Sequence, residues 1–348
     1  MRNVTRRDFV KGSLMAAAAA VPGLVPRPAG TQERMTVTVY AGVWEKAMRE
    51  TFLPCFKRDV PNVEIDFLTG NETDWIAKVQ ANPRRPPVQV MLAGVVHSLT
   101  AKRLGLLEKI DPAKVPNLKD LPPDMLFPDG HGVIVDWGAA GLVFNKEVVK
   151  EPPKSWEEFI ARTVKGEFGK KVMMPSINYA FTDLAVIWTW ANAYGGDVDK
   201  AFEKIRAVKP HVVKWWSSPA DVVKLLVTRE AVIGPYFDGR AWALHRDGNP
   251  WVGYVNPAPG VARTEVAVHK IVGSPDAAWN YINCMIDPEA QAGFSEMVLY
   301  AMSNPKVKYP ASVAHMISKP SDTIRPPIEE VLKQRVKWVE RWNKEIGG

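Results

Sequence analysis

Signatures of catalysis and metal binding are scarce in this 348-residue sequence. It lacks the H-E-x-x-H, G-x-S-x-G, Walker and G-x-G-x-x-G motifs. Ser303 and Lys306 have the spacing of a Ser/Lys nucleophile pair, but Asn304-Pro305 between them disfavours the helix that such a pair needs. The six histidines are scattered without metal-ligand spacing. We therefore expect a binding protein with no metal and no cofactor, and keep a hydrolytic enzyme as the alternative class.

Long apolar runs and basic segments are also missing. No apolar stretch reaches the roughly 20 residues that a membrane-spanning helix needs, and no internal repeat is present. The formal charge is +7, but +4 of it lies in the first 29 residues, where five basic residues accompany a single acid, Asp8. Nucleic-acid binding is therefore not expected, because it needs a basic face in the folded part of the chain.

The N-terminus resembles a twin-arginine export signal. Thr5-Arg6-Arg7-Asp8-Phe9-Val10-Lys11 precedes a short apolar run, and a Pro/Gly/Ala stretch suited to cleavage near Ala29 or Gly30 follows. We expect residues 1–30 to be a twin-arginine signal peptide and the mature protein to be periplasmic.

Only two cysteines are present, Cys55 and Cys284. They could pair in an oxidising compartment. Each lies in an apolar helical pattern, however, where a buried free thiol is the commoner arrangement. We therefore expect no disulfide.

Tryptophan and a regular alternation of strand and helix patterns are abundant. The thirteen tryptophans suit an aromatic-lined ligand site, although a Trp-rich core would explain them equally well. The alternation predicts a parallel sheet covered by helices. The expected strands are 35–40, 63–67, 88–92, 171–174, 231–234, 251–255 and 264–268. The expected helices are 44–56, 73–80, 98–106, one opened by a capping box at Ser155 to Glu158, 182–194, 201–208, 219–227, two opened at Ser274-Pro275 and Asp287-Pro288, and 328–346.

One stretch, V-I-V-D-W-G-A-A-G-L-V-F-N at 133–145, stands out among the predicted strands. Its ends are apolar and β-branched, whereas small residues surround Asp136 and Trp137 at its centre. Glycine weakens a strand interior unless something approaches the backbone closely. We therefore interpret 133–145 as a crossing between two lobes with a ligand above it, and 251–268 as a second crossing.

Several short segments, taken in their order along the chain, resemble those of a known protein family. They are Asn71-Glu72-Thr73, Ile110-Asp111 to Leu121-Pro122-Pro123-Asp124-Met125, Trp137-Gly138-Ala139, Ser155-Trp156, Tyr236-x-Asp238-Gly239-Arg240-Ala241 and Tyr300 to Asn304. Together they resemble the type II periplasmic solute-binding proteins of ABC importers, in the spermidine/putrescine-binding branch. The resemblance covers nearly the whole mature chain. It implies an α/β fold of two Rossmann-like lobes joined by two hinge strands, with lobe 1 at 35–136 and 256–303 and lobe 2 at 137–255 and 304–348. It also implies a monomer that captures a small-molecule ligand between closing lobes and delivers it to an ABC permease and ATPase complex at the inner membrane.

The ligand class follows from departures from that family. Where its polyamine binders carry acids in lobe 2, this chain has Ser176, Asn178 and Tyr179, and Arg263 and Thr264 follow the second crossing. Because this chain lacks those acids and carries an arginine instead, we predict that its ligand is a carboxylate, phosphonate or zwitterion bound by Arg263 or Arg240. A polyamine, which needs acids or aromatic faces around its charge, remains the alternative. A ferric ion is a weaker one, because the family's iron binders use neighbouring tyrosines and no two tyrosines are adjacent here.

The candidate ligand-binding residues lie at predicted strand ends, helix starts and crossings. The turn 41–43 offers backbone donors at a helix N-terminus, and Tyr236 comes just past the carboxyl end of a strand, where ligands gather in open α/β sheets. Asp238 could equally be the N-cap of a helix at 239–246. The full set is Gly42, Trp44, Asp136, Trp137, Ser176, Asn178, Tyr179, Trp216, Tyr236, Asp238, Arg240, Arg263, Thr264 and Tyr300.

Overall fold

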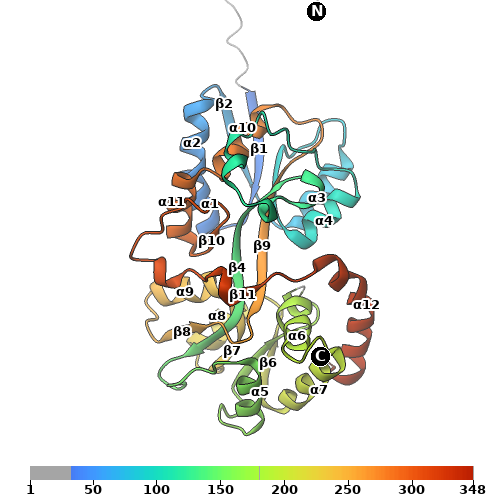
Figure 1. The fold of residues 1–348 in the computed structure, drawn as a ribbon, viewed down its shortest axis with the longest axis vertical. Helices are drawn as coiled ribbons and strands as arrows, with labels where there is room; N and C mark the ends of the chain where they lie inside the picture. Colours follow the sequence, from blue (N-terminus) through green and yellow to red (C-terminus); the bar gives the residue numbers. More distant parts are fainter. Residues whose placement is uncertain (1–32, 180, 348) are drawn as a thin grey trace, which may run out of the picture. The chain divides into compact units, whose positions relative to one another are not determined.

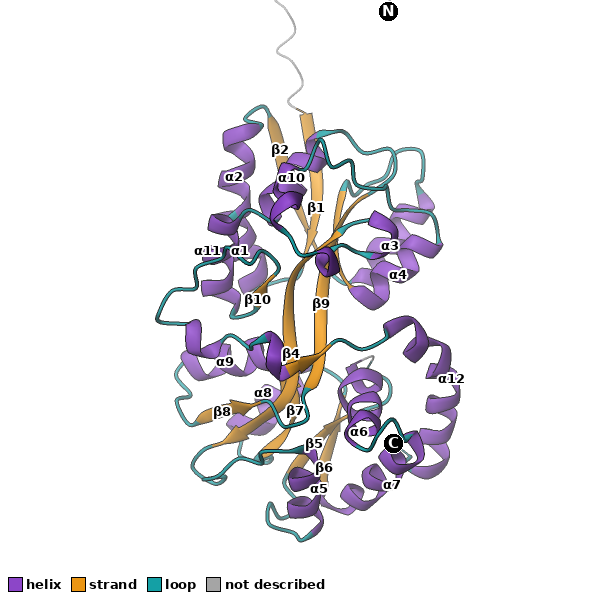
Figure 2. Ribbon diagram, in the orientation of Figure 1, coloured by secondary structure: helices purple, strands orange, loops and turns teal. Residues whose placement is uncertain are grey.

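The computed structural model describes residues 33–179 and 181–347. The expected signal peptide at 1–30 lies outside the described residues. Helices flank a central set of strands (Figures 1 and 2). The strands are β1 (Glu33–Val39), β2 (Val63–Thr69), β3 (Val90–Gly94), β4 (Val133–Asn145), β5 (Val172–Pro175), β6 (Val212–Trp216), β7 (Ile233–Phe237), β8 (Val252–Val255), β9 (Val261–Lys270), β10 (Ala301–Met302) and β11 (Thr323–Ile324).

The α-helices are α1 (Val43–Glu50), α2 (Phe52–Asp59), α3 (Glu72–Ala81), α4 (Val95–Arg103), α5 (Trp156–Val164), α6 (Thr189–Ala193), α7 (Val198–Val208), α8 (Pro219–Val227), α9 (Asp238–Arg246), α10 (Ala277–Met285), α11 (Pro288–Val298) and α12 (Ile328–Glu345). A π-helical segment, η4 (Asp183–Trp188), precedes α6. Short 3-10 helices are η1 (Pro116–Asp120), η2 (Pro123–Met125), η3 (Pro128–Gly130), η5 (Lys209–His211), η6 (Ala314–Met316) and η7 (Pro320–Asp322). Within the described part of the chain, no helix combines the length and apolar content needed to cross a bilayer.

The strands form a mixed sheet with the order β2-β1-β3-β9-β4-β7-β5-β6, and β8, β10 and β11 pair at its sides. Parallel pairing joins β1 to β2 and β3, and β5 to β6 and β7, whereas β9 pairs antiparallel with β3 and β4, and β4 pairs antiparallel with β7. The α/β fold expected from the alternating pattern is therefore confirmed. The sheet is mixed because β9 runs antiparallel to the set of β1, β2 and β3, and β4 runs antiparallel to the set of β5, β6 and β7.

β4 and β9 lie side by side through the middle of the described chain (Figure 1). All 13 residues of β4 are buried, which explains its nearly uninterrupted apolar sequence. Its small residues allow close packing. A Cβ on Gly138 would lie 2.7 Å from the Tyr300 ring, and one on Gly141 would lie 2.6 Å from the Tyr254 hydroxyl. The small centre of the strand thus accommodates two tyrosine side chains.

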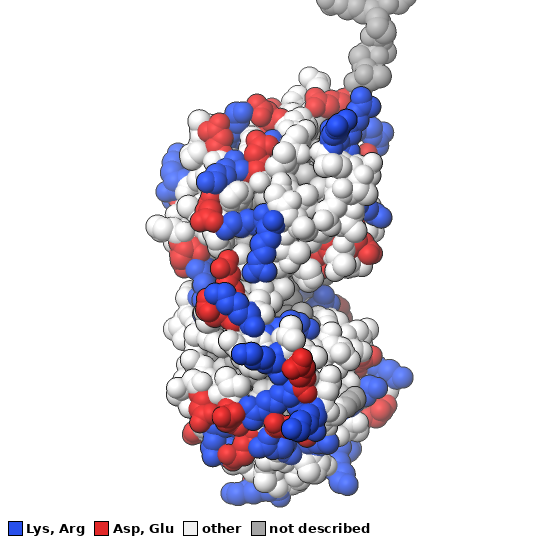
Figure 3. All heavy atoms as spheres, turned by 90° about the vertical axis from the view of Figure 1, so that its right-hand side faces the viewer, with Lys and Arg blue, Asp and Glu red and all other residues white. Residues whose placement is uncertain are grey.

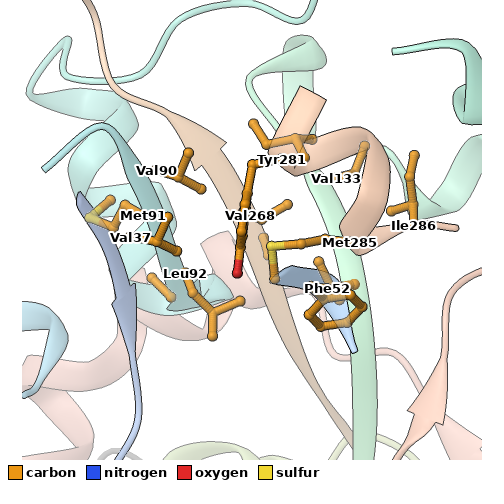
Figure 4. Close-up of a cluster of buried hydrophobic side chains, with 14 of the residues drawn as sticks. Val37, Phe52, Val90, Met91, Leu92, Val133, Val268, Tyr281, Met285 and Ile286 are labelled. Atoms are coloured by element: carbon orange, nitrogen blue, oxygen red, sulfur yellow. The ribbon is translucent and has the colours of Figure 1, made fainter. Parts of the chain in front are cut away.

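Two large clusters of buried side chains lie along these central strands. The first packs β1, β3 and the first part of β4 against α2 and α10, and Figure 4 shows Phe52, Tyr281 and Met285 converging on the strands. The second packs β5, β7 and the last part of β4 against α5 to α8 and α12. Trp137 belongs to the first cluster and Ala139, two residues later, to the second. One continuous strand therefore contributes to both cores.

Most of the predicted helices and strands are present, but the bounds or the type of some differ from the prediction. α8 has the predicted bounds, and α11 begins with Asp287 as N-cap and Pro288 at its first position, as expected. The predicted helix 44–56 is two helices separated at Thr51, whose hydroxyl bonds back to the Ala47 carbonyl at 2.7 Å. The Trp215-Trp216 segment, which is not among the expected strands, is the end of β6.

Cys55 and Cys284 form a disulfide, so the expectation of free thiols was wrong. They lie on α2 and α10, which pack together, although 229 residues separate them in sequence. The helical patterns correctly predicted that both cysteines are buried, but a buried cysteine can be either a free thiol or part of a disulfide. The missing information was the proximity of two distant helices.

Acidic and basic side chains are interspersed on the face that carries α3, α4 and α12 (Figure 3). Many belong to ion pairs, such as Lys102 with Asp129 and Lys333 with Glu330. A less exposed pair, Arg335 with Asp183, joins α12 to the π-helical segment η4. This contact fixes the C-terminal helix against the second buried cluster.

Candidate functional site

A cavity of about 360 Å³ lies beside the central strands and receives side chains from elements of both buried clusters. Its size is within the range of small-ligand sites. Five aromatic rings, three carboxyl groups and one guanidinium group line it. The lining residues are Tyr40, Trp44, Glu72, Gly94, Asp136, Gly138, Tyr179, Pro219, Phe237, Arg240, Thr264, Glu265, Val266 and Tyr300.

Glu72, at the start of α3, is oriented by two neighbouring groups. The Tyr40 hydroxyl donates to its Oε1 at 2.6 Å, and the Gly94 backbone N–H lies 3.5 Å from the same oxygen. Burial of the Tyr40 side chain, together with the Glu72 charge, raises the pKa of its hydroxyl well above 10. Tyr40 therefore remains a proton donor to the Glu72 carboxyl group at the wall of the cavity.

Asp136 is held in the cavity wall by an irregularity in β4. The register with β9 shifts between Ile134 and Asp136, and such bulges re-aim side chains. The side chain is 1% exposed, and its Oδ2 has no hydrogen-bond partner among the described residues. Burial, and then the nearby Asp238 carboxyl, raise the pKa of Asp136 well above 3.8. A buried acid without a cation beside it favours a ligand that brings one.

Asp238 is a second buried acid close to Asp136, and its side chain does not line the cavity. It is fully buried at the first position of α9, where its Oδ1 accepts the Gly239 N–H at 2.7 Å. It is therefore not the N-cap, a position that Phe237 occupies. Burial raises its pKa to about 7, against opposing hydrogen bonds from Ser318 and from the backbone of Ala139 and Gly239.

The raised pKa of Asp238 predicts that the ligand-free protein loses stability as the pH rises. The folded state keeps the proton up to about pH 7, whereas an unfolded aspartate releases it near 3.9. The contribution of Asp238 is therefore complete below pH 4 and is lost as the pH rises through 7, at about 1.4 kcal/mol per pH unit. Urea unfolding at pH 5 and pH 7 should show a steeper loss in the wild type than in Asp238→Asn. Equal losses in both proteins would contradict this assignment.

Arg240 provides the positive charge of the cavity. It lies in the first turn of α9, and the described residues supply no ion-pair partner for its guanidinium group. The aromatic side of the cavity includes Trp44, whose ring centre lies 5.1 Å from that of Tyr40 and 5.9 Å from that of Tyr300. Such ring faces attract cations. The cavity can thus hold positive charge against rings and carboxylates, and negative charge at Arg240.

Arg263 and Glu265 lie on β9 and are engaged with other protein groups. The Arg263 guanidinium stacks on Trp137 at 4.5 Å and donates from Nε and Nη2 to the Thr323 hydroxyl at 3.2 and 3.1 Å. Glu265 accepts from Arg325 Nε at 2.7 Å. Arg263 does not line the main cavity but a smaller neighbouring one. Its expected role as a free anion anchor is therefore not supported by its contacts.

The structure brings together six of the predicted site residues at the main cavity: Trp44, Asp136, Tyr179, Arg240, Thr264 and Tyr300. The other eight do not line it. Trp137 is buried under Arg263, Asp238 lies behind Asp136, and Trp216 and Tyr236 are buried behind Tyr179. Tyr236 donates its hydroxyl to the Pro219 carbonyl at 3.0 Å, so it supports the wall from outside. The remaining four, Gly42, Ser176, Asn178 and Arg263, lie outside the main cavity's lining.

Sequence reasoning missed eight lining residues, which are Tyr40, Glu72, Gly94, Gly138, Pro219, Phe237, Glu265 and Val266. Three of them could have been predicted from the sequence by their position at the end of a strand. Tyr40 follows β1, Gly94 ends β3 and Phe237 ends β7, and ligands gather at the carboxyl ends of strands. The same rule selected Tyr236, but successive strand residues point to opposite faces, and Phe237 is the residue that faces the cavity.

A grouping of potential metal ligands among the described residues is Cys55, Asp59 and Cys284. Both sulfur atoms belong to the disulfide, so they are unavailable to a metal ion.

Comparison with known proteins places the chain among solute-binding proteins. Residues 55–318 match the family model "Bacterial extracellular solute-binding protein". A thiamine-binding periplasmic protein of Salmonella typhimurium is 22% identical over 61% of this chain and 63% of its own length, less than two thirds of that relative. Spermidine/putrescine-binding periplasmic protein 1 of Haemophilus influenzae is 23% identical over 78% of this chain and 76% of its own.

A solved structure agrees with these sequence matches. The crystal structure of a Bordetella parapertussis protein, described as an extracellular solute-binding protein, superposes with a TM-score of 0.81 at 26% identity. The superposition covers 90% of this chain and 99% of that one. The expected periplasmic-binding-protein fold is thereby confirmed.

Proposed function

Because the chain belongs to the family of bacterial extracellular solute-binding proteins, we propose that it is the substrate-binding component of an ABC importer. This family serves transport and is not enzymatic, which agrees with the lack of catalytic motifs. In this proposal the protein reaches the periplasm by twin-arginine export and works there as a monomer. It captures one small solute and presents it to a permease and ATPase complex at the inner membrane.

The observation that carries the proposal is the cavity that receives side chains from both buried clusters. We propose that the clusters are two lobes that close on the solute by bending along β4 and β9. A solute stabilises the closed form only as far as it binds that form more tightly. The cores suggest changes in the lobe boundaries. Val261 and Ala262 pack in the second cluster, although they were expected in lobe 1, and Trp137 packs in the first cluster, although it was expected in lobe 2.

The cavity supports a narrower solute class than the sequence did. The wall carries three carboxyl groups, and the described residues place no cation beside Asp136, which makes a purely anionic ligand unfavourable. Aromatic rings and carboxylates suit a positively charged nitrogen, and Arg240, which has no ion-pair partner among the described residues, suits a carboxylate. We therefore propose a small zwitterion with its ammonium group toward Asp136 and its anionic group toward Arg240.

A cation without an anionic group is the second candidate. The excess of carboxyl groups over Arg240 favours it, and the two relatives above are named for thiamine and for spermidine or putrescine, which are cations. The two candidates differ in the role of Arg240, which should assist a zwitterion and repel a simple cation.

A thermal-shift panel on the purified protein tests this proposal. The compounds are alanine and 4-aminobutyrate as zwitterions, putrescine, spermidine and thiamine as cations, and succinate and methylphosphonate as anions. A true ligand at 100 times its Kd should stabilise the protein by about 2.7 kcal/mol.

The matched variants are Arg240→Gln, in the cavity, and Arg34→Gln, whose guanidinium pairs with Asp66 on the exposed edge. Zwitterion binding that only Arg240→Gln weakens supports the proposal. Binding of cations alone, improved by Arg240→Gln, selects the second candidate. Stabilisation by anions alone contradicts both.

A further inference from the structure

A second chamber of about 220 Å³ adjoins the main cavity. The two share six wall residues, Glu72, Gly94, Tyr179, Phe237, Thr264 and Glu265. They are therefore neighbouring compartments of one cleft. The proposed head group, with its charges near Asp136 and Arg240, would occupy only the main cavity, since neither residue lines the second chamber.

The walls that belong only to the second chamber are mainly apolar, namely Val95, Val96, Phe181, Leu184 and Ile328, together with His97 and Arg263. The charged groups at its edge have protein partners. Arg263 is held by Trp137 and Thr323, and Glu265 by Arg325. The chamber thus offers apolar contact and little unsatisfied charge.

We propose that the solute has two parts, a charged head in the main cavity and an apolar arm in the second chamber. This inference rests on the proposed function and adds the shape and polarity of the solute. Water against the apolar walls is released when an arm enters, which favours binding. Each methylene buried is worth about 0.8 kcal/mol, or roughly fourfold in Kd. Solutes that share a head should therefore bind more tightly as the arm lengthens, until the chamber is full.

Gly94 provides a way to restrict the passage between the chambers. It lines both, and its φ of −60° is compatible with any L-residue. A Cβ added there would meet only Glu72 Oε1, at 3.7 Å, an ordinary contact. Gly94→Ala should therefore fold normally while placing a methyl group at the boundary.

The experiment is calorimetric titration with two series that differ in the head and lengthen in the arm. The first is 2-aminobutyrate, norleucine and 2-aminooctanoate, and the second is ethylammonium, butylammonium and hexylammonium. For wild type we expect Kd to fall about fourfold per methylene in the series whose head binds. In Gly94→Ala the loss of affinity should grow with the length of the compound, so that the longest compound loses at least tenfold more than the shortest.

A pair of leucine substitutions completes the design. Leu184→Ala removes an apolar wall of the second chamber and should reduce the gain with length, whereas Leu104→Ala, at an exposed residue (44%) after α4, should change nothing. Length dependence in the ammonium series alone would reject the zwitterion and keep the two-part solute. Affinity independent of length in the series that binds would overturn this inference and leave the proposed function intact. Binding of neither series by a protein that a panel compound stabilises would overturn this inference alone, whereas stabilisation by no zwitterion or cation of the panel would overturn the proposed solute as well.

Discussion

Replacing Asp136 with asparagine should remove most of the solute affinity and leave the fold as stable as before, or more stable. The carboxyl is 1% exposed, and its Oδ2 has no hydrogen-bond partner in the part of the chain that the structure describes, so the ligand-free protein gains nothing from a charge there. The proposed ammonium group would supply the missing partner. Losing one member of a buried charged pair costs 2–5 kcal/mol, so the Kd should rise about 30-fold or more.

The measurement is titration calorimetry with the panel compound that binds wild type most tightly, together with urea unfolding of both proteins. Asp66→Asn is the matched control, because Asp66 also lies on a strand but pairs with Arg34 at an exposed edge. A variant that binds as tightly as wild type would exclude Asp136 from the site. Lower affinity accompanied by a large loss of stability would indicate a structural role instead.

Local patterns predicted the fold well where one element determines its own conformation. The Asp287-Pro288 start of α11 and the Pro219–Val227 helix follow from capping and periodicity alone. The long crossing strand was also predictable, since every residue of β4 is buried and its sequence is almost wholly apolar. The order of these elements carried the family resemblance.

The site was predictable only in part, because side-chain direction in a strand depends on register. Asp136 was identified, yet the bulge that turns it into the wall involves β9, more than 120 residues later. Phe237 faces the cavity and Tyr236 the core, a choice that a shift of one residue reverses.

Arg263 illustrates a second limit. An arginine after a predicted crossing suggested an anion site, but its partners are Trp137 and Thr323, 126 residues earlier and 60 residues later. No residue near Arg263 in the sequence predicts its contact with Trp137 or with Thr323. Glu265 is similar, since its partner Arg325 is also 60 residues away. Charges engaged by distant groups cannot be distinguished from free ones by sequence alone.

Removing the disulfide should cost the protein about 2–5 kcal/mol of unfolding free energy. Cys55 and Cys284 are 229 residues apart, and a cross-link that closes a long loop restricts the unfolded chain most in the chain-entropy model. The test is urea unfolding of wild type with and without dithiothreitol, beside Cys55→Ala/Cys284→Ala. Wild type should lose stability on reduction, and the double variant should not respond to the reductant.

The disulfide and the cavity should be separable in this experiment. Cys55 and Cys284 pack in the first cluster between α2 and α10, and neither lines the cavity. Reduced wild type and the double variant should therefore keep the solute affinity of the oxidised protein at urea-free conditions. An unchanged unfolding midpoint on reduction would contradict the stabilising role. Loss of affinity with the fold intact would mean instead that the α2–α10 contact controls the geometry of Trp44 and Tyr300, since α11 packs against both α1 and α2.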